Sequence, residues 1–103
     1  MQTTLTTRGD AAAIVPQPLA TGLDHLPLHA RALVTGMRPA RDAQERAMAL
    51  RLLEIGFLPG EAVRVLARGG LGGDPIAVRV GQATFALRRR EASMVQVQQE
   101  ASP

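Results

Sequence analysis

The residues able to do acid–base or metal chemistry are few and scattered. His25 and His29 stand four residues apart, a spacing that puts two ligands on one face of a helix, but Pro27 between them interrupts a helix. Ser93 has no histidine near it in the sequence to act as a general base. The chain has no Lys for Schiff-base chemistry and no Cys for a thiolate nucleophile or zinc site. We therefore predict no catalytic residues, no cofactor and no metal ligand set, and we do not expect an enzyme.

Two segments have the composition of anion-binding sites. The Gly-rich loop 69–75 lacks the Gly-Lys-Ser/Thr sequence and the following helix that a phosphate-binding P-loop needs. Arg88–Arg90 is the densest positive charge; we place it at the end of a strand, with Glu91 as a candidate partner and phosphate or an acidic protein surface as candidate ligands. A net charge of +3 and only two aromatic residues predict no nucleic-acid-binding surface. The absence of Tyr and Trp likewise excludes an aromatic groove for Pro-rich peptides.

Length and hydropathy limit the architecture. A chain of 103 residues forms one small domain, and its hydrophobic content of 46% is typical of a globular protein. No apolar run is long enough to cross a membrane, and the run Ala11–Val15 is shorter than the apolar part of a secretory signal. We expect a soluble cytoplasmic protein with no membrane insertion.

The two ends of the chain lack a sustained hydropathy pattern. Residues 1–22 are rich in Thr, Ala, Gly and Pro, which predicts a mobile N-terminal extension; the alternative is a short strand at Ala12–Val15. Residues 98–103 are predicted to fray. Between these ends we predict one domain over 23–97, which opens with a single turn at Leu23–Pro27 that directs two leucines into the core.

The segment Asp42–Ile55 carries the clearest helix signal. Asp42 followed by Glu45 is typical of a capping box, in which the Asp42 side chain accepts the backbone N–H of Glu45 and the Glu45 side chain accepts the backbone N–H of Asp42. Met48, Leu52 and Ile55 recur at helical spacing and mark the buried face. Gly56 suits the left-handed residue that ends a helix, and Pro59–Gly60 suits the centre of a type II turn.

Elsewhere the hydropathy period is two, which indicates strands. The predicted strands are Ala30–Thr35, Ala62–Ala67, Ile76–Val80, Thr84–Leu87 and Met94–Val97. Full or partial barrel closure protects the edges of so many short strands. We therefore predict a mainly β fold: a small SH3-like β-barrel of about five strands, with one α-helix inserted after the first strand.

The segment Met48–Glu61 (MALRLLEIGFLPGE) resembles the signature of the FeoA family, small accessory proteins of bacterial ferrous iron transport. Further segments match that family in the same order: Leu23–Val34, Glu61–Val65, Gly73–Val78, Phe85–Arg89 and Glu91–Ala92. The resemblance covers about residues 23–97. It implies an SH3-like barrel that acts in the cytoplasm by contact with FeoB, a membrane ferrous iron transporter whose cytoplasmic part is a GTPase.

For the contact surface we single out the corner that follows the helix. Phe57 and Leu58 come directly after the helix stop, so one of them is expected to be buried and the other exposed. The predicted partner-binding residues are Phe57, Leu58, Pro59, Arg64 and Leu71. Small barrels with open strand edges often self-associate, so a second copy is also a candidate partner.

A rival hypothesis comes from a further similarity, to the C-terminal module of DtxR-type metal-dependent repressors. It implies a transition-metal-binding or metal-sensing SH3-like module. The 22 residues before the domain are too few for the helix-turn-helix that such a repressor needs.

Overall fold

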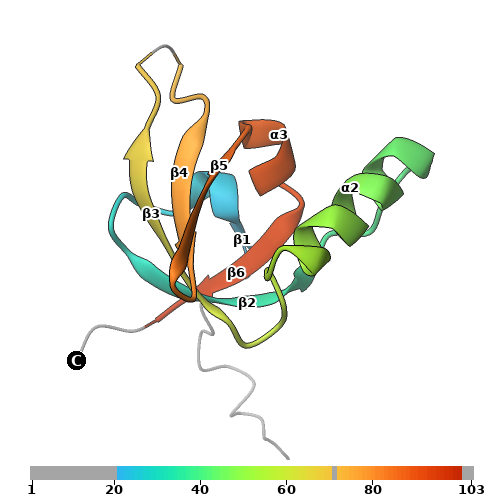
Figure 1. Ribbon diagram of the computed structural model, residues 1–103, viewed down its shortest axis with the longest axis horizontal. Coiled ribbons are helices and arrows are strands. Elements are labelled where there is room, and N and C mark those ends of the chain that lie inside the picture. The colour runs from blue at the N-terminus through green and yellow to red at the C-terminus, as the bar shows by residue number, and fades with distance from the viewer. Residues whose placement is uncertain (1–20, 71, 101–103) are drawn as a thin grey trace, which may run out of the picture.

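The computed structural model describes residues 21–70 and 72–100, which form a curved six-stranded sheet with three short helical segments (Figure 1). The strands are β1 (Thr21–Gly22), β2 (Arg31–Met37), β3 (Ala62–Arg68), β4 (Ile76–Val80), β5 (Ala83–Leu87) and β6 (Val95–Gln99). The helical segments are the 3-10 turn η1 (Leu23–His25), α2 (Ala43–Glu54) and α3 (Arg89–Ala92). No helix in this described part of the chain is long and apolar enough to cross a membrane.

The strand order is β1-β6-β2-β3-β4-β5, and every pair is antiparallel. The prediction of a mainly β, SH3-like architecture is confirmed, but two details of it are wrong: there are six strands rather than five, and the sheet is not closed into a barrel. The additional strand, β1, has two residues and is too short to produce an alternating pattern. The edges β1 and β5 do not pair, and α3 packs against both η1 and β5 at that opening.

The concave side of the sheet holds the hydrophobic core. Alternate residues of β2, β3, β4 and β6 point inward, as the period of two predicted. The single turn predicted at Leu23–Pro27 is confirmed, since η1 places Leu23 and Leu26 fully inside. The fully buried large side chains are Phe57, Leu23, Leu26, Ile76, Met94, Val34, Val63, Val65, Val78, Val95 and Val97.

Helix α2 is one residue shorter at each end than the predicted range, since Asp42 is its N-cap and Ile55 its C-cap, and it projects away from the sheet (Figure 1). The Asp42 side chain accepts the Glu45 amide at 2.8 Å, as predicted, but Glu45 does not return the bond to Asp42. Its carboxylate accepts from the Arg41 backbone N–H at 2.9 Å, from the Arg41 guanidinium at 3.0 Å and from Arg38 at 3.3 Å. These bonds, the Arg41 side chain first, lower the pKa of Glu45 to about 2.

The Arg88–Arg90 segment differs from its prediction. It follows the end of β5 at Leu87, as predicted, but Arg88 is the N-cap of α3 and the next two arginines lie in that helix. Glu91 forms its ion pair with Arg51 of α2, at 3.6 Å. Within the segment Glu91 accepts only the Arg88 backbone N–H, at 2.9 Å, because a helical turn brings N–H and carboxylate together at that spacing.

Most of the predicted end segments, and the alternative strand at Ala12–Val15, lie outside the described residues. Of the predicted extension the structure describes Thr21 and Gly22, which form β1. Of the predicted tail it describes 98–100, with Gln98 and Gln99 in β6.

Candidate partner-binding surface

The corner after α2 is built by backbone hydrogen bonds that the sequence encodes locally. The N–H of Phe57 donates to Leu52 O at 3.0 Å and that of Gly56 to Leu53 O at 3.1 Å, which is a Schellman C-cap. Gly56 has φ 124°, a value open to a residue without a Cβ. The cap turns the chain sharply and fixes the direction in which the next two side chains leave the helix.

The side chains of Phe57 and Leu58 differ in burial, as predicted: one points into the core and the other towards solvent. Phe57 is fully buried, and its ring centroid lies 6.2 Å from that of Phe85. Leu58 is 47% exposed. Phe57 therefore supports the corner from inside, and Leu58 is the member of the pair that another molecule can touch.

The predicted Pro59–Gly60 turn holds Leu58 in place. The Glu61 N–H donates to Leu58 O at 3.0 Å, and Gly60 has φ 92°, as a type II turn requires. The turn is also tied to β2, because the Gly60 N–H donates to Val34 O at 2.7 Å and the Val34 N–H to Glu61 O at 2.9 Å. The exposed pair Leu58–Pro59 is thus a rigid apolar corner.

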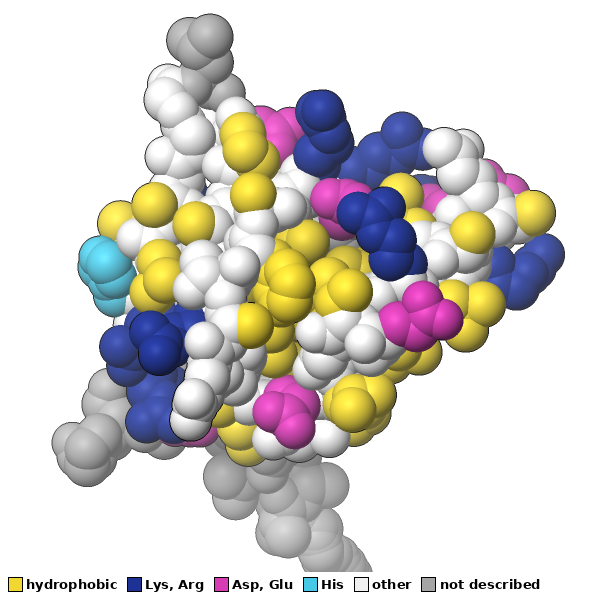
Figure 2. Space-filling model, in the orientation of Figure 1, with side chains coloured by type: hydrophobic (Ala, Val, Ile, Leu, Met, Phe, Trp, Pro, Cys, Tyr) yellow, Lys and Arg dark blue, Asp and Glu magenta, His cyan; other side chains and the backbone are white. Residues whose placement is uncertain are grey.

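Arg64 lies in a row of arginines that crosses the sheet. In the strand register Arg64 of β3 stands directly opposite Arg31 of β2 on one side and Arg79 of β4 on the other. All three side chains are exposed on the convex side of the sheet. Figure 2 shows basic side chains gathered at the left of the view, over β2 and β3. We call Arg31, Arg64 and Arg79 the arginine row.

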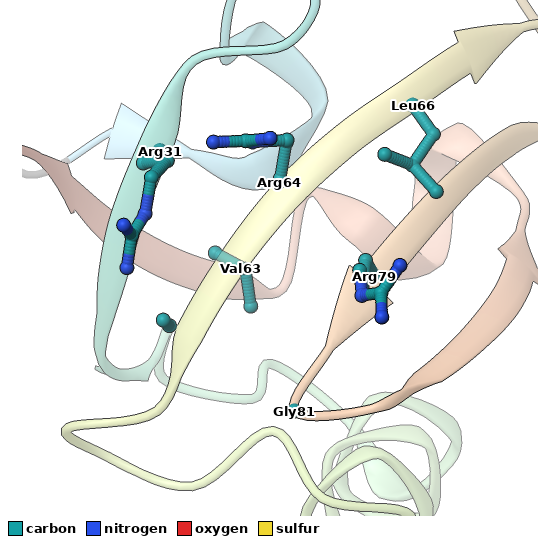
Figure 3. A pocket seen from close by; sticks show the side chains of 7 residues that line it. Arg31, Val63, Arg64, Leu66, Arg79 and Gly81 are labelled. Atoms are coloured by element: carbon teal, nitrogen blue, oxygen red, sulfur yellow. The ribbon is translucent and has the colours of Figure 1, made fainter.

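The arginine row borders a shallow depression of about 260 Å³ (Figure 3). Its lining residues are Arg31, Ala62, Val63, Arg64, Leu66, Arg79 and Gly81. The sides of the row are apolar: Leu33 pairs with Ala62 along one side, and Leu66 lies along the other. Leu33 is 39% exposed. A concentrated positive charge therefore sits between two apolar margins.

Few acidic groups balance this charge. Arg31 Nε lies 4.0 Å from Glu100 Oε1, a long contact between exposed side chains. Among the ion pairs formed within 21–70 and 72–100, none includes Arg64 or Arg79. Like charges directly opposite each other in a sheet are destabilising, so the row lowers the stability of the isolated domain.

The last predicted contact residue, Leu71, lies outside the described residues. The loop around it is attached to α3, because Asp74 Oδ1 accepts the Arg89 N–H at 3.0 Å and the Arg89 side chain donates to Gly72 O at 3.3 Å. The partner-binding roles of Phe57, Leu58, Pro59, Arg64 and Leu71 stay predictions. Of these residues the structure makes Leu58, Pro59 and Arg64 accessible and places them within one short segment, 58–64.

The two histidines do not share a helix face. His25 is the last residue of η1, and its Nε2 lies 3.4 Å from Oδ2 of Asp24. His29 is in a turn and has φ 69°. The part of the chain that the structure describes contains no group of three His, Asp or Glu residues placed to hold a metal ion.

Sequence reasoning singled out Arg64 but missed Arg31 and Arg79. Both occupy polar positions in strands whose residues alternate between apolar and polar, and this alternation was the signal that could have identified them as exposed. Nothing in the linear sequence aligns the three, because β2 and β3 are separated by α2 and because a one-residue slip in register moves a side chain to the other face.

Comparison with known proteins gives the family. The model of the FeoA domain matches residues 21–99. No curated protein gave a significant match. Among solved structures, FeoA of Stenotrophomonas maltophilia, a zinc complex described as an SH3 domain protein, is 45% identical with a TM-score of 0.65, and the match covers 79% of this chain and 96% of that one.

Two further structures are similar over most of this chain. The FeoA protein of Chlorobium tepidum is 31% identical with a TM-score of 0.65, over 78% of this chain and 70% of that one. A manganese-dependent transcriptional repressor is 29% identical with a TM-score of 0.66, over 87% of this chain but only 47% of the repressor. Together with the domain match over 21–99, the sequence and the fold establish that the chain belongs to the FeoA family.

Proposed function

We propose that this protein is a non-enzymatic, cytoplasmic accessory protein of ferrous iron uptake that acts by binding the cytoplasmic part of a FeoB-type GTPase transporter. Membership of the FeoA family supports a role in ferrous iron transport. The S. maltophilia relative is described as a candidate activating factor of that process.

The observation that carries the contact mechanism is the rigid apolar corner. An exposed leucine next to a proline, held by a Schellman cap and a type II turn, presents apolar surface with a smaller loss of backbone conformational entropy on binding than a flexible loop would have. Arg64 lies six residues further along the chain and is exposed on β3. Arg is enriched, and charged residues in general are depleted, at the centres of protein interfaces.

The test is binding of the full chain to the detergent-solubilised transporter from the same organism. Leu58→Asp should abolish binding while the thermal unfolding curve stays close to that of the wild type, because the side chain is half exposed. Leu28→Asp is the matched control, since Leu28 is also 47% exposed but lies before β2. Wild-type protein that fails to bind the transporter would contradict the function, and unchanged binding of Leu58→Asp would contradict the corner.

The second candidate function is a transition-metal-binding or metal-sensing module. The specific support is the 29% identity to the manganese-dependent repressor. This function predicts Fe²⁺ or Mn²⁺ binding that titration calorimetry detects. Calorimetry without heat of binding for either ion would dismiss it.

A further inference from the structure

The arginine row destabilises the isolated domain, and no structural role within the domain requires it. Three exposed cations stand directly opposite one another on β2, β3 and β4, at the spacing where like charges oppose folding. We propose that the row binds an acidic helix of the partner, which lies across the strands and places one carboxylate on each arginine. This inference rests on the proposed function, since it specifies the chemistry of the partner's contact segment.

The chemistry of the row favours a carboxylate-bearing ligand. Each guanidinium offers several donors in a planar fork that can hold a carboxylate with two parallel hydrogen bonds. The contact between Arg31 and Glu100, at 4.0 Å between exposed side chains, is long enough to be exchanged for a better one. A bound helix with three carboxylates would convert mutual repulsion within the row into three charge-assisted pairs.

The spacing of the row favours a helix over an extended segment. Neighbouring strands lie about 4.8 Å apart, whereas a helix repeats about every 5.4 Å along its axis. Over the two strand intervals from Arg31 to Arg79 the mismatch is about 1 Å, which the long arginine side chains absorb. An extended peptide presents one face only about every 6.7 Å and accumulates a mismatch of about 4 Å. Extended peptides also usually bind at a sheet edge rather than across a face.

The surroundings of the row favour a protein over a nucleic acid or a small phosphate. Leu33 and Leu66 border the arginines on both sides and suit the apolar flanks of an amphipathic helix. Sites for single-stranded nucleic acid typically combine a basic groove with aromatic side chains on which successive bases stack. Phe57 is fully buried, and Phe85 packs against it from inside the sheet.

The first experiment measures binding of the full chain to the solubilised transporter at low and moderate salt. Arg64→Glu/Arg79→Glu should weaken binding about tenfold or more, as expected for central interface arginines. Arg46→Glu, which reverses an exposed charge on α2, should leave binding unchanged. If the double variant binds like the wild type while Leu58→Asp does not bind, the row is not part of the contact and the proposed function still stands.

A second experiment tests the row without the transporter. Two synthetic peptides of about 20 residues, long enough to be helical, carry the same number of Glu residues, either aligned one per turn or distributed around the helix. Titration of the isotope-labelled full chain should shift the backbone amides of Arg31, Arg64 and Arg79 at lower concentrations of the aligned peptide than of the distributed one. Equal effects of both peptides would overturn the helix proposal, as would tighter binding of inorganic triphosphate than of the aligned peptide.

Discussion

Replacement of Arg64 by Gln should make the isolated protein more stable. Arg64 is the middle member of the arginine row and stands directly opposite both Arg31 and Arg79. Gln keeps a polar, flexible side chain on the exposed face of β3, shorter than Arg, and removes the charge. The substitution therefore relieves two like-charge contacts while it leaves the buried face of the strand, Val63 and Val65, untouched.

The size of the gain follows from the cross-strand spacing. Two unit charges held at the cross-strand Cβ spacing of about 5 Å in water repel by about 0.8 kcal/mol, and physiological salt screens about half of that. This is an upper limit, because the guanidinium groups at the ends of the arginine side chains can move further apart than the Cβ atoms. Two such contacts amount to about 0.8 kcal/mol. For a domain of this size that free energy corresponds to a rise in melting temperature of about 3–6 °C.

The assay is thermal unfolding followed by circular dichroism, at low salt and in about 0.5 M NaCl, where the Debye length falls to a few ångströms. Arg46→Gln is the control, since it removes one positive charge from α2 and so changes the net charge of the protein by the same amount. At low salt Arg64→Gln should raise the melting temperature more than Arg46→Gln does. The difference between the two variants should shrink at high salt. A variant no more stable than Arg46→Gln, or a gain that salt does not alter, would refute the repulsion within the row.

Phe57→Ala should destabilise the protein by about 3–5 kcal/mol, whereas Leu58→Ala should change the free energy of unfolding by less than about 0.5 kcal/mol, since only Phe57 is buried. Urea unfolding of the two variants measures this difference, and similar losses of stability would contradict the buried and exposed positions assigned to the two side chains. Gly60→Ala should cost about 1 kcal/mol or more, measured in the same way, because φ is 92° at this position and strains a residue with a Cβ. Glu45→Gln should be less stable than the wild type at pH 7; because the folded pKa of about 2 lies below the ordinary 4.5, the difference should shrink as the pH falls from about 4.5 towards 2. Melting temperatures over that range measure it, and a difference that does not change with pH would show that the carboxylate charge is not responsible.

The local signals in the sequence were reliable because they depend on near neighbours. The Asp42 cap, the Gly56 stop and the Pro59–Gly60 turn all formed as predicted, since each rests on hydrogen bonds within a few residues. The second half of the predicted capping box failed because Glu45 has stronger donors in Arg38 and Arg41. Arg38 is seven residues away, and only the path of the chain between β2 and α2 brings it within reach.

Short elements were the least predictable part of the fold. β1 has two residues and α3 has four, so neither shows a hydropathy period. Both depend on what they pack against: β1 on the edge of β6, and α3 on η1 and β5. These two elements account for the sixth strand and for the correction at Arg88–Arg90.

The sequence alone determined the elements with a clear period, most of the residues that enter the core and the exposed position of one member of the Phe57–Leu58 pair, because hydropathy alternation and cap residues act over a few positions. On the predicted apolar face of α2 only Leu52 is buried, whereas Met48 and Ile55 are half-buried. The tertiary structure alone decided that the sheet stays open and that Arg31, Arg64 and Arg79 stand side by side. Strand register is set by pairing between segments far apart in the chain, and a shift of one residue would reverse the face on which each arginine lies. The candidate binding row is therefore a product of register, which no local pattern in the sequence specifies.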